Sequence, residues 1–361
     1  MIRGEFDQNY MDFQQSHIRL QQIQADLERS RSNTTQIQSD LDGLNFKENT
    51  SKKQRQPSNN NSINEKIGSH WSSVAKESVE LRVRWWQSPH IIRHINEKIA
   101  GSPLEGFSQG LTQRAKEMAG HCCPFSRGVS VGCGNGQKEI TLIRQGLVSS
   151  FELYELSEVR VDQGRKLARD LGVEDRVNFY IGDAFEIVKD IESFDFVHWN
   201  NSLHHMLDVE ASIKWSYNVL SKGGMFYMDD YVGPSRFQWS DKMLEMVSKV
   251  RGVLPENYLV NPRSPDKLLP KQINRPKVEE LMQIDPSEAA DSERILYFVN
   301  QYFPKAEVTL TGGVVYHLAL SDVLHNFDES RDRHLLDLLM IIDDLCAELG
   351  ESTYATALAI K

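Results

Sequence analysis

Three glycines alternate with other residues at Gly132, Gly134 and Gly136, directly after a short β-type run. The residues that follow, 137–144, have helical character. A strand, a glycine turn and a helix start together let the backbone approach a ligand closely and direct free N–H groups at it. The GxGxG spacing differs from the GxGxxG of dinucleotide binders, so the turn alone only weakly indicates its ligand.

Carboxylate and amide side chains end the later β-type runs. A carboxylate that ends the second run of such a series can accept both hydroxyls of a ribose. The runs and the polar residues that end them are 151–154 with Glu155, 177–181 with Asp183, 194–199 with Asn200 and Asn201, and 225–228 with Asp229 and Asp230.

The elements that must position these side chains alternate along the chain between β-type runs and helical segments. Strands that alternate with helices predict an α/β fold, in which helices cover a parallel sheet. In such sheets ligands bind beyond the carboxyl ends of the strands, where all of these polar residues fall. We therefore expect one site at one edge of the sheet.

Over about residues 120–231, the order and spacing of these features resemble the class I S-adenosylmethionine-dependent methyltransferases. The resemblance implies a Rossmann-like sheet of seven strands, with 307–313 and 354–360 as the last two, and S-adenosyl-L-methionine as cofactor. It also implies the cofactor-binding residues: Gly132, Cys133, Gly134, Asn135 and Gly136 for the methionine part, Glu155 and Leu156 for the ribose, Asp183, Ala184 and Phe185 for the adenine, and Asn200 beside the sulfonium.

One position departs from the pattern of this family. Ser130 stands two residues before the first glycine, where the family usually has an acid. The family's contact to the amino group of the cofactor must then come from another side chain, and Glu139 is a candidate.

The catalytic candidates follow the fourth and fifth runs. Methyl transfer is an in-line displacement from a cationic sulfur, and a hydroxyl acceptor also needs a group that takes up its proton. A neutral imidazole suits this role, and His204 and His205 follow the fourth run. The sequence does not rank the two histidines, and either could instead be structural. Asp229 and Tyr231, at the end of the fifth run, are further candidates.

A metal site is an alternative at the same place. Asp229 and Asp230, with Asn200 and Asn201, could hold Mg²⁺ and lower the pKa of the acceptor. Neighbouring side chains of a strand point in opposite directions, however, so we expect an enzyme without a metal.

The segment 261–277 contains four prolines and five basic residues against one acid. A long connector after the fifth strand, about 232–284, is expected to form a substrate lid. Its local positive charge, which includes Arg263 and Arg275, predicts an anionic acceptor. A solvated basic loop is the alternative.

The N-terminal region carries a different pattern. Apolar residues recur with 3-4 spacing between Phe13 and Leu44, which predicts a coiled coil over 1–45 and a homo-oligomer. An amphipathic helix that lies on the chain's own domain is the alternative. The polar residues 46–66 predict a flexible linker, and the methyltransferase domain would occupy 67–361.

Additions to that domain are predicted to be helical. Residues 71–99 contain tryptophan and isoleucine at helical spacing, and they predict an extension that packs on the core or roofs a pocket. Residues 314–350 predict a buried helical insertion. Asp285 to Glu288 predict a helix start, with Asp285 as its cap.

Composition excludes several classes of partner. The 361 residues include 41 basic and 51 acidic side chains, and the net charge of −10 argues against nucleic acid. No apolar run approaches the ~18 residues of a membrane span. Four cysteines without a CxxC pair predict a reducing, cytoplasmic location and no structural zinc.

Together these features predict a cytoplasmic methyltransferase that acts on a small molecule. A hydroxyl of a sugar or of a biosynthetic intermediate is the first candidate for the acceptor. The alternatives are N-methylation of a small amine or peptide-derived product, and a non-catalytic scaffold that binds the cofactor and is recruited through the coiled coil.

Overall fold

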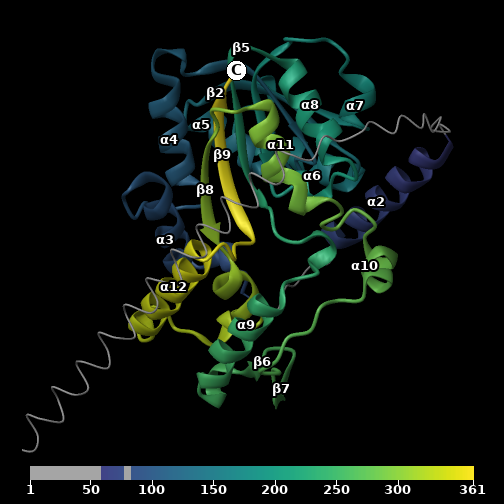
Figure 1. Cartoon of the computed structure of the whole chain (residues 1–361). Helices are drawn as coiled ribbons and strands as arrows, with labels where there is room; N and C mark the ends of the chain where they lie inside the picture. The colour runs from purple at the N-terminus through teal and green to yellow at the C-terminus, as the bar shows by residue number, and fades with distance from the viewer. Residues whose placement is uncertain (1–57, 77–82) are drawn as a thin grey trace, which may run out of the picture. The chain divides into compact units, whose positions relative to one another are not determined.

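A seven-stranded sheet is the centre of the protein in the computed structural model, which describes residues 58–76 and 83–361. The strand order is β3-β2-β1-β4-β5-β9-β8, with β8 and β9 antiparallel to their neighbours (Figure 1). This confirms the predicted fold and both C-terminal strands. The strands are β1 (Phe125–Val131), β2 (Val148–Glu155), β3 (Val177–Ile181), β4 (Phe194–Asn200), β5 (Leu220–Tyr231), β8 (Glu307–Gly312) and β9 (Tyr354–Ile360).

Helices cover both faces of the sheet because its strands are apolar on both sides. Successive residues of β5 alternate between the two cores: Tyr227 packs in one and Phe226 in the other. The first core is covered by α4 (Gln109–Ala119), α5 (Gln137–Arg144) and α6 (Glu158–Asp170), and the second by α8 (Val209–Val219) and α11 (Ile295–Tyr302).

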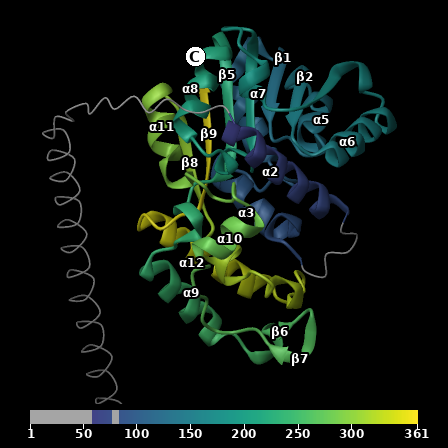
Figure 2. The same cartoon turned by 90° about the vertical axis from the view of Figure 1, so that its right-hand side faces the viewer.

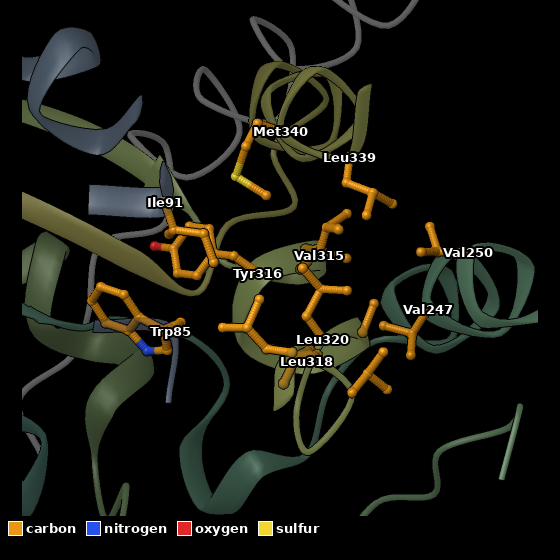
Figure 3. Close-up of a cluster of buried hydrophobic side chains, with 14 of the residues drawn as sticks. Trp85, Ile91, Val247, Val250, Val315, Tyr316, Leu318, Leu320, Leu339 and Met340 are labelled. Carbon is orange, nitrogen blue, oxygen red and sulfur yellow. The ribbon is translucent and has the colours of Figure 1, made fainter. Parts of the chain in front are cut away.

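A helical cap with its own core lies beyond the carboxyl ends of the central strands (Figures 1 and 2). The side chains of this core interdigitate around a short π-helical turn, as Figure 3 shows. The cap elements are α3 (Pro89–Ala100), α9 (Asp241–Val253), α10 (Val278–Ile284), the π-turn η8 (Val314–Ala319), α12 (Arg333–Glu348) and the hairpin of β6 (Val260–Asn261) and β7 (Ser264–Leu268).

The predicted helical insertion is present as η8 and α12, but α12 is buried on one face only. Leu336, Leu339 and Met340 pack in the cap core. Leu338, Ile341 and Leu345 are more than half exposed in this chain. The chain's own residues therefore bury one face of the helix, and burial of the other face, which the sequence also predicted, would require another subunit.

At the N-terminal end, the structure describes the chain from Ser58. The predicted coiled coil, 1–45, lies outside the described residues. The helix α2 (Ser58–Lys76) begins inside the segment predicted as linker, so residues 58–66 are helical instead. Ile63, Ile67 and Trp71 recur at every fourth residue, which gives this helix an apolar stripe despite its polar composition. Among the described helices, none is long and apolar enough to cross a membrane.

Candidate active site

The glycine turn after β1 requires glycine at its alternate positions. Gly132, Gly134 and Gly136 have φ angles of 65°, 60° and 68°, a region that other residues rarely adopt. A Cβ at Gly132 would lie 3.1 Å from the Cβ of Ser202, which follows β4. The turn is therefore shaped by glycine and lies directly against the loop that carries the predicted catalytic histidines.

Glu155 connects this turn to the end of β2. Its Oε2 accepts the N–H of Gly134 at 2.8 Å, and its Oε1 accepts the N–H groups of Leu156 and Ser157. Burial raises the pKa of Glu155, against the effect of these donors. The other predicted turn residues are close by: Cys133 donates its N–H to the Tyr154 carbonyl, and Asn135 accepts the N–H of Gln137.

Asp183 begins the short helix α7 (Ala184–Ile187) after β3. Its Oδ1 accepts the N–H of Phe185 at 2.8 Å, and its Oδ2 accepts a hydrogen bond from the Asn64 amide at 3.2 Å. Ala184 is fully buried beside it. Asp183 and Phe185 therefore stand at the strand end where the resemblance placed the adenine.

Glu139 supplies the buried acid that is absent at Ser130. Its Oε1 accepts the Ser130 hydroxyl at 2.7 Å and lies 2.9 Å from Nδ1 of His198. Burial alone would raise the pKa of Glu139, but the bond to His198 lowers it. Its Oε2 is buried and has no hydrogen-bond partner in the described chain. An orphaned carboxylate oxygen beside the turn fits a ligand with an amino group.

The helix α2 lies along α6 and contacts three parts of the site (Figures 1 and 2). Besides the Asn64 bond, the hydroxyls of Ser72 and Ser157 are 2.9 Å apart. The Trp71 ring lies 4.7 Å from the Arg160 guanidinium and meets the His205 ring edge to face at 5.2 Å. The sequence left open whether residues 71–99 pack on the core or roof a pocket, and Trp71 lies over the site.

His204 lies between two carboxylates. Its Nδ1 is 2.5 Å from Oδ1 of Asp230, and its Nε2 is 3.5 Å from Oε1 of Glu288. Burial alone would lower the pKa of His204, but the two carboxylates outweigh it and raise the pKa to about 10. Asp230 also accepts the N–H groups of Ser202 and Leu203, so it holds the whole loop against β5.

His205 has the opposite environment. Burial and the neighbouring His204 lower its pKa, so its ring is neutral at pH 7. The Ser287 hydroxyl lies 2.6 Å from Oδ1 of Asp285 and 3.0 Å from Nδ1 of His205. Because the hydroxyl has one proton, which goes to the carboxylate, His205 donates from Nδ1 and keeps a lone pair on Nε2. The structure thus distinguishes two histidines that the sequence could not rank.

The adjacent acids Asp229 and Asp230 face opposite sides of β5, as strand geometry requires. Asp229 accepts the Ser108 hydroxyl at 3.0 Å, and burial raises its pKa to about 6. Asn201 donates to Asn200 instead of turning to either acid, and the Asn200 carbonyl accepts the Lys138 ammonium. The alternative Mg²⁺ set therefore does not converge among these described residues.

Tyr231, the fourth catalytic candidate, donates its hydroxyl to the Pro234 carbonyl at 3.2 Å. Burial raises its pKa far above the usual value. Its ring meets those of His204 and His317 edge to face, at 6.0 and 5.9 Å. Tyr231 is thus an aromatic wall of the site and not a proton acceptor.

Two basic side chains of the segment 261–277 make local contacts and do not face the site. Arg275 bonds the Trp239 carbonyl and pairs with Asp241, and Lys277 pairs with Glu280. The β6–β7 hairpin lies at the end of the cap far from the sheet in both views (Figures 1 and 2). This arrangement favours the alternative of a solvated basic loop.

The sequence did not indicate that Asp285, Ser287 and Glu288 belong to the site, and it favoured a structural role for His317. Residues 285–288 form a turn instead of the predicted helix start, because Asp285 accepts the N–H and the hydroxyl of Ser287. His317 lies in η8, and its Nδ1 is buried without a hydrogen-bond partner in the described chain. No local pattern marks these residues. A small pocket beside them is lined by Val83, Arg84, Trp85, Trp86, Tyr316, His317, Leu320, Ser321 and Asp322.

Comparisons with known proteins agree on one domain. Residues 127–275 match a family model described as a methyltransferase domain. The 27-O-demethylrifamycin SV methyltransferase of Amycolatopsis mediterranei (strain S699) is 34% identical over 132 residues, which are 36% of this chain and 47% of that protein. Methyltransferase GfsG of Streptomyces halstedii is 29% identical over 148 residues, 41% and 49% of the two chains.

The chain spans about half the length of the curated relatives it matches. Among solved structures, geranyl diphosphate C-methyltransferase from Streptomyces coelicolor A3(2) is 15% identical, with a TM-score of 0.45, over 82% of this chain and 97% of that one.

Proposed function

Because the chain belongs, through residues 127–275, to the class I S-adenosylmethionine-dependent methyltransferases, we propose that it methylates a hydroxyl group of a small molecule. The observation that supports the methyl-transfer part is the group of side chains around the glycine turn. The resemblance assigns Glu155 to the ribose and Asp183 to the adenine, and Glu139 is our candidate for the amino group. Oε2 of Glu139 is buried and has no hydrogen-bond partner among the described residues, which supports this last assignment.

The residues of the cradle each have one task. Gly132, Gly134 and Gly136 allow the backbone to approach the cofactor, and Glu155 holds the turn in place while it presents its remaining lone pairs to the ribose. When bound, S-adenosylmethionine supplies an electrophilic methyl group on a cationic sulfur.

The acceptor hydroxyl is proposed to bind beside His204, His205 and Glu288, and His205 is proposed to receive its proton. The neutral ring of His205 supports this assignment, because its Nε2 keeps a lone pair. His204 and Asp230 fix the position of the loop, and Asp229 and Tyr231 support it from β5. The name of the rifamycin relative, which refers to a 27-O-demethyl compound, also favours an oxygen acceptor.

The pocket beside His317 is small and mostly polar. Trp85 and Tyr316 are buried in the cap core, so Trp86 is the exposed aromatic side chain of this lining, and Arg84, Ser321 and Asp322 contribute polar groups. Such a lining suits one polar group of an acceptor, such as a hydroxyl.

Formation of S-adenosylhomocysteine by the purified full-length protein tests the proposal. A panel of hydroxylated polycyclic and macrocyclic compounds, matched amines and simple sugars would be screened with labelled cofactor. We expect turnover with hydroxylated ring compounds and its loss in Asp183→Asn, while the exposed Asp266→Asn keeps it. Methyl transfer to amines alone would show that the acceptor atom is nitrogen and not oxygen. Cofactor binding without turnover on any acceptor would favour a non-catalytic scaffold.

A further inference from the structure

We propose that His204, His205 and Glu288 bind a divalent transition-metal ion, with Zn²⁺ the closest match to the donor set. Its catalytic role, to hold and acidify the acceptor hydroxyl, rests on the proposed function, whereas its existence does not. Each residue offers one ligand atom, and these atoms lie within 4.8 Å of one another. Two imidazoles and one carboxylate with a position left open are typical of catalytic zinc sites.

One pair of the three donor atoms already has the spacing of a metal site. Nε2 of His204 and Oε1 of Glu288 are 3.5 Å apart, which is too long for a strong hydrogen bond. Ligands that are each about 2.0–2.2 Å from a tetrahedral ion lie roughly 3.3–3.6 Å from one another. The rings of His204 and His205 are 4.1 Å apart between centroids and tilted by 39°.

Both histidines are oriented as metal ligands usually are. A metal-bound imidazole almost always donates its second N–H to a carboxylate, carbonyl or water. Nδ1 of His204 bonds Asp230 at 2.5 Å, and Nδ1 of His205 bonds Ser287, which in turn bonds Asp285. Nε2 of His205 therefore keeps a lone pair, and Nε2 of His204 becomes a donor to a cation once it loses the proton that faces Glu288. Asp230 is itself held by backbone N–H groups, so it cannot easily turn away.

The charge around the site is incomplete without a cation. Three carboxylates, Asp230, Asp285 and Glu288, surround two imidazoles. Oδ2 of Asp285 is buried, lies 3.7 Å from Nδ1 of His205 and has no hydrogen-bond partner in the described chain. The nearby cation Arg236 donates to the carbonyls of Pro286 and Glu288. Without an ion, protonated His204 and Arg236 offset two of the three negative charges. A divalent ion that displaced the proton of His204 would, together with Arg236, balance all three.

The site lies where an acceptor would meet the cofactor. The same loop that carries the two histidines contacts Gly132 through Ser202. A hydroxyl bound in the open position would have a lowered pKa and would release its proton to solvent. Its oxygen would then form the C–O bond to the methyl carbon as the C–S bond breaks, and the electron pair would stay on sulfur. Nitrogen donors favour Zn²⁺ over Mg²⁺, which prefers oxygen ligands.

Calorimetric titration of the metal-stripped, full-length protein with Zn²⁺ tests this site. Co²⁺ in place of Zn²⁺ adds a visible absorption band that reports the ligand geometry. We expect one tightly bound ion per chain, and a loss of affinity of at least 100-fold in His205→Gln and in Glu288→Gln. Ser287→Ala removes only the support of His205 and should weaken binding about 10-fold. His334→Gln, at a fully exposed histidine, is the matched control and should bind as the wild type does.

Binding of S-adenosylhomocysteine by each variant shows whether it is folded. A variant that keeps this binding but loses the ion supports the site. Equal Zn²⁺ affinity in wild type, His205→Gln and Glu288→Gln, or no binding below millimolar concentration, would overturn it. Turnover that survives complete chelation would show that the metal has no role in catalysis, and it would leave the methyltransferase proposal unchanged. A bound ion with no turnover on any acceptor would support the metal site and contradict the proposed methyl transfer.

Discussion

At the scale of single residues, the site depends on buried carboxylates whose partners differ from one acid to the next. Glu155 and Asp230 accept several backbone N–H groups each, and they shape loops. Among the described residues, Glu139 and Asp285 each have one buried carboxylate oxygen without a hydrogen-bond partner. Because an unpaired buried acceptor costs about 1–3 kcal/mol, such atoms point to ligands more directly than acids that already bond the backbone do.

Glu139→Gln tests the assignment of the cofactor's amino group. The amide keeps an acceptor for Ser130 but loses the negative charge, so we expect S-adenosylhomocysteine to bind about 10- to 100-fold more weakly, because hydrogen bonds to charged groups are worth about 1.5–3 kcal/mol. Calorimetry measures this dissociation constant. Glu186→Gln, on the exposed side of α7, should leave it unchanged. Unaltered affinity in Glu139→Gln would contradict the assignment.

Asp229 predicts a pH dependence of stability. Its pKa is raised from 3.8 to about 6 in the folded protein by burial. Between these two pH values the folded state still binds a proton that the unfolded state has lost. The free energy of unfolding therefore falls as the pH rises through this range. The difference corresponds to at most about 3 kcal/mol.

Urea denaturation between pH 4 and pH 7 measures this effect. The free energy of unfolding of the wild type should fall more steeply than that of Asp229→Asn, whose amide still accepts the Ser108 hydroxyl without a charge. The exposed Asp266→Asn should follow the wild type. Parallel curves for wild type and Asp229→Asn would show that the buried carboxyl does not have this raised pKa.

At the scale of elements, the sequence did not predict that α2 packs against the cofactor-binding half of the sheet. It packs on α6 so closely that a Cβ at Gly68 would lie 2.7 Å from the Leu156 carbonyl oxygen. The contact joins a helix expected in part as linker to the strand end that carries Glu155. We infer that α2 covers the bound cofactor and slows its release.

Gly68→Ala separates helix propensity from this contact. Alanine favours a helix over glycine by about 1 kcal/mol, yet here it must push α2 away from β2. We expect the dissociation constant of S-adenosylhomocysteine to rise about 10-fold, with little change in melting temperature. Gly252→Ala in α9, where a Cβ would meet no atom within 4 Å, should instead raise stability by about 0.5–1 kcal/mol and leave cofactor affinity unchanged. The same affinity in both variants would remove the covering role of α2.

At the scale of the whole molecule, the net charge of −10 resides on the segment from 67 onward, because residues 1–66 contain nine basic and nine acidic side chains. The helical cap is an addition to the sheet, and its aliphatic and aromatic core surrounds η8 (Figure 3). His317 of η8 interacts electrostatically with Glu288. The exposed stripe of Leu338, Ile341 and Leu345 lies on the outer face of this cap.

The predicted coiled coil of residues 1–45 is tested by truncation. Light scattering should give a larger mass per particle, in multiples of the chain mass, for the full chain than for a chain that starts at Pro57. The repeat of apolar residues between Phe13 and Leu44 is the reason for this expectation. Equal numbers of chains per particle in the two proteins would show that the segment does not assemble them.

Local patterns in the sequence were enough to predict the sheet, the glycine turn and the acids that end the strands. These features depend on residues within about ten positions of one another, so their spacing alone is informative. His204 and His205 were found in this way, but their difference was not.

Only the tertiary structure brought Asp230, Asp285 and Glu288 around those two rings. Asp230 reaches His204 across 26 positions, and Ser287 reaches His205 across 82. The charge state of an imidazole depends on burial and on nearby carboxylates, and those distances come from packing. The sequence by itself therefore determined the fold and the place of the site, and the tertiary structure decided which side chains share it and what chemistry they can perform.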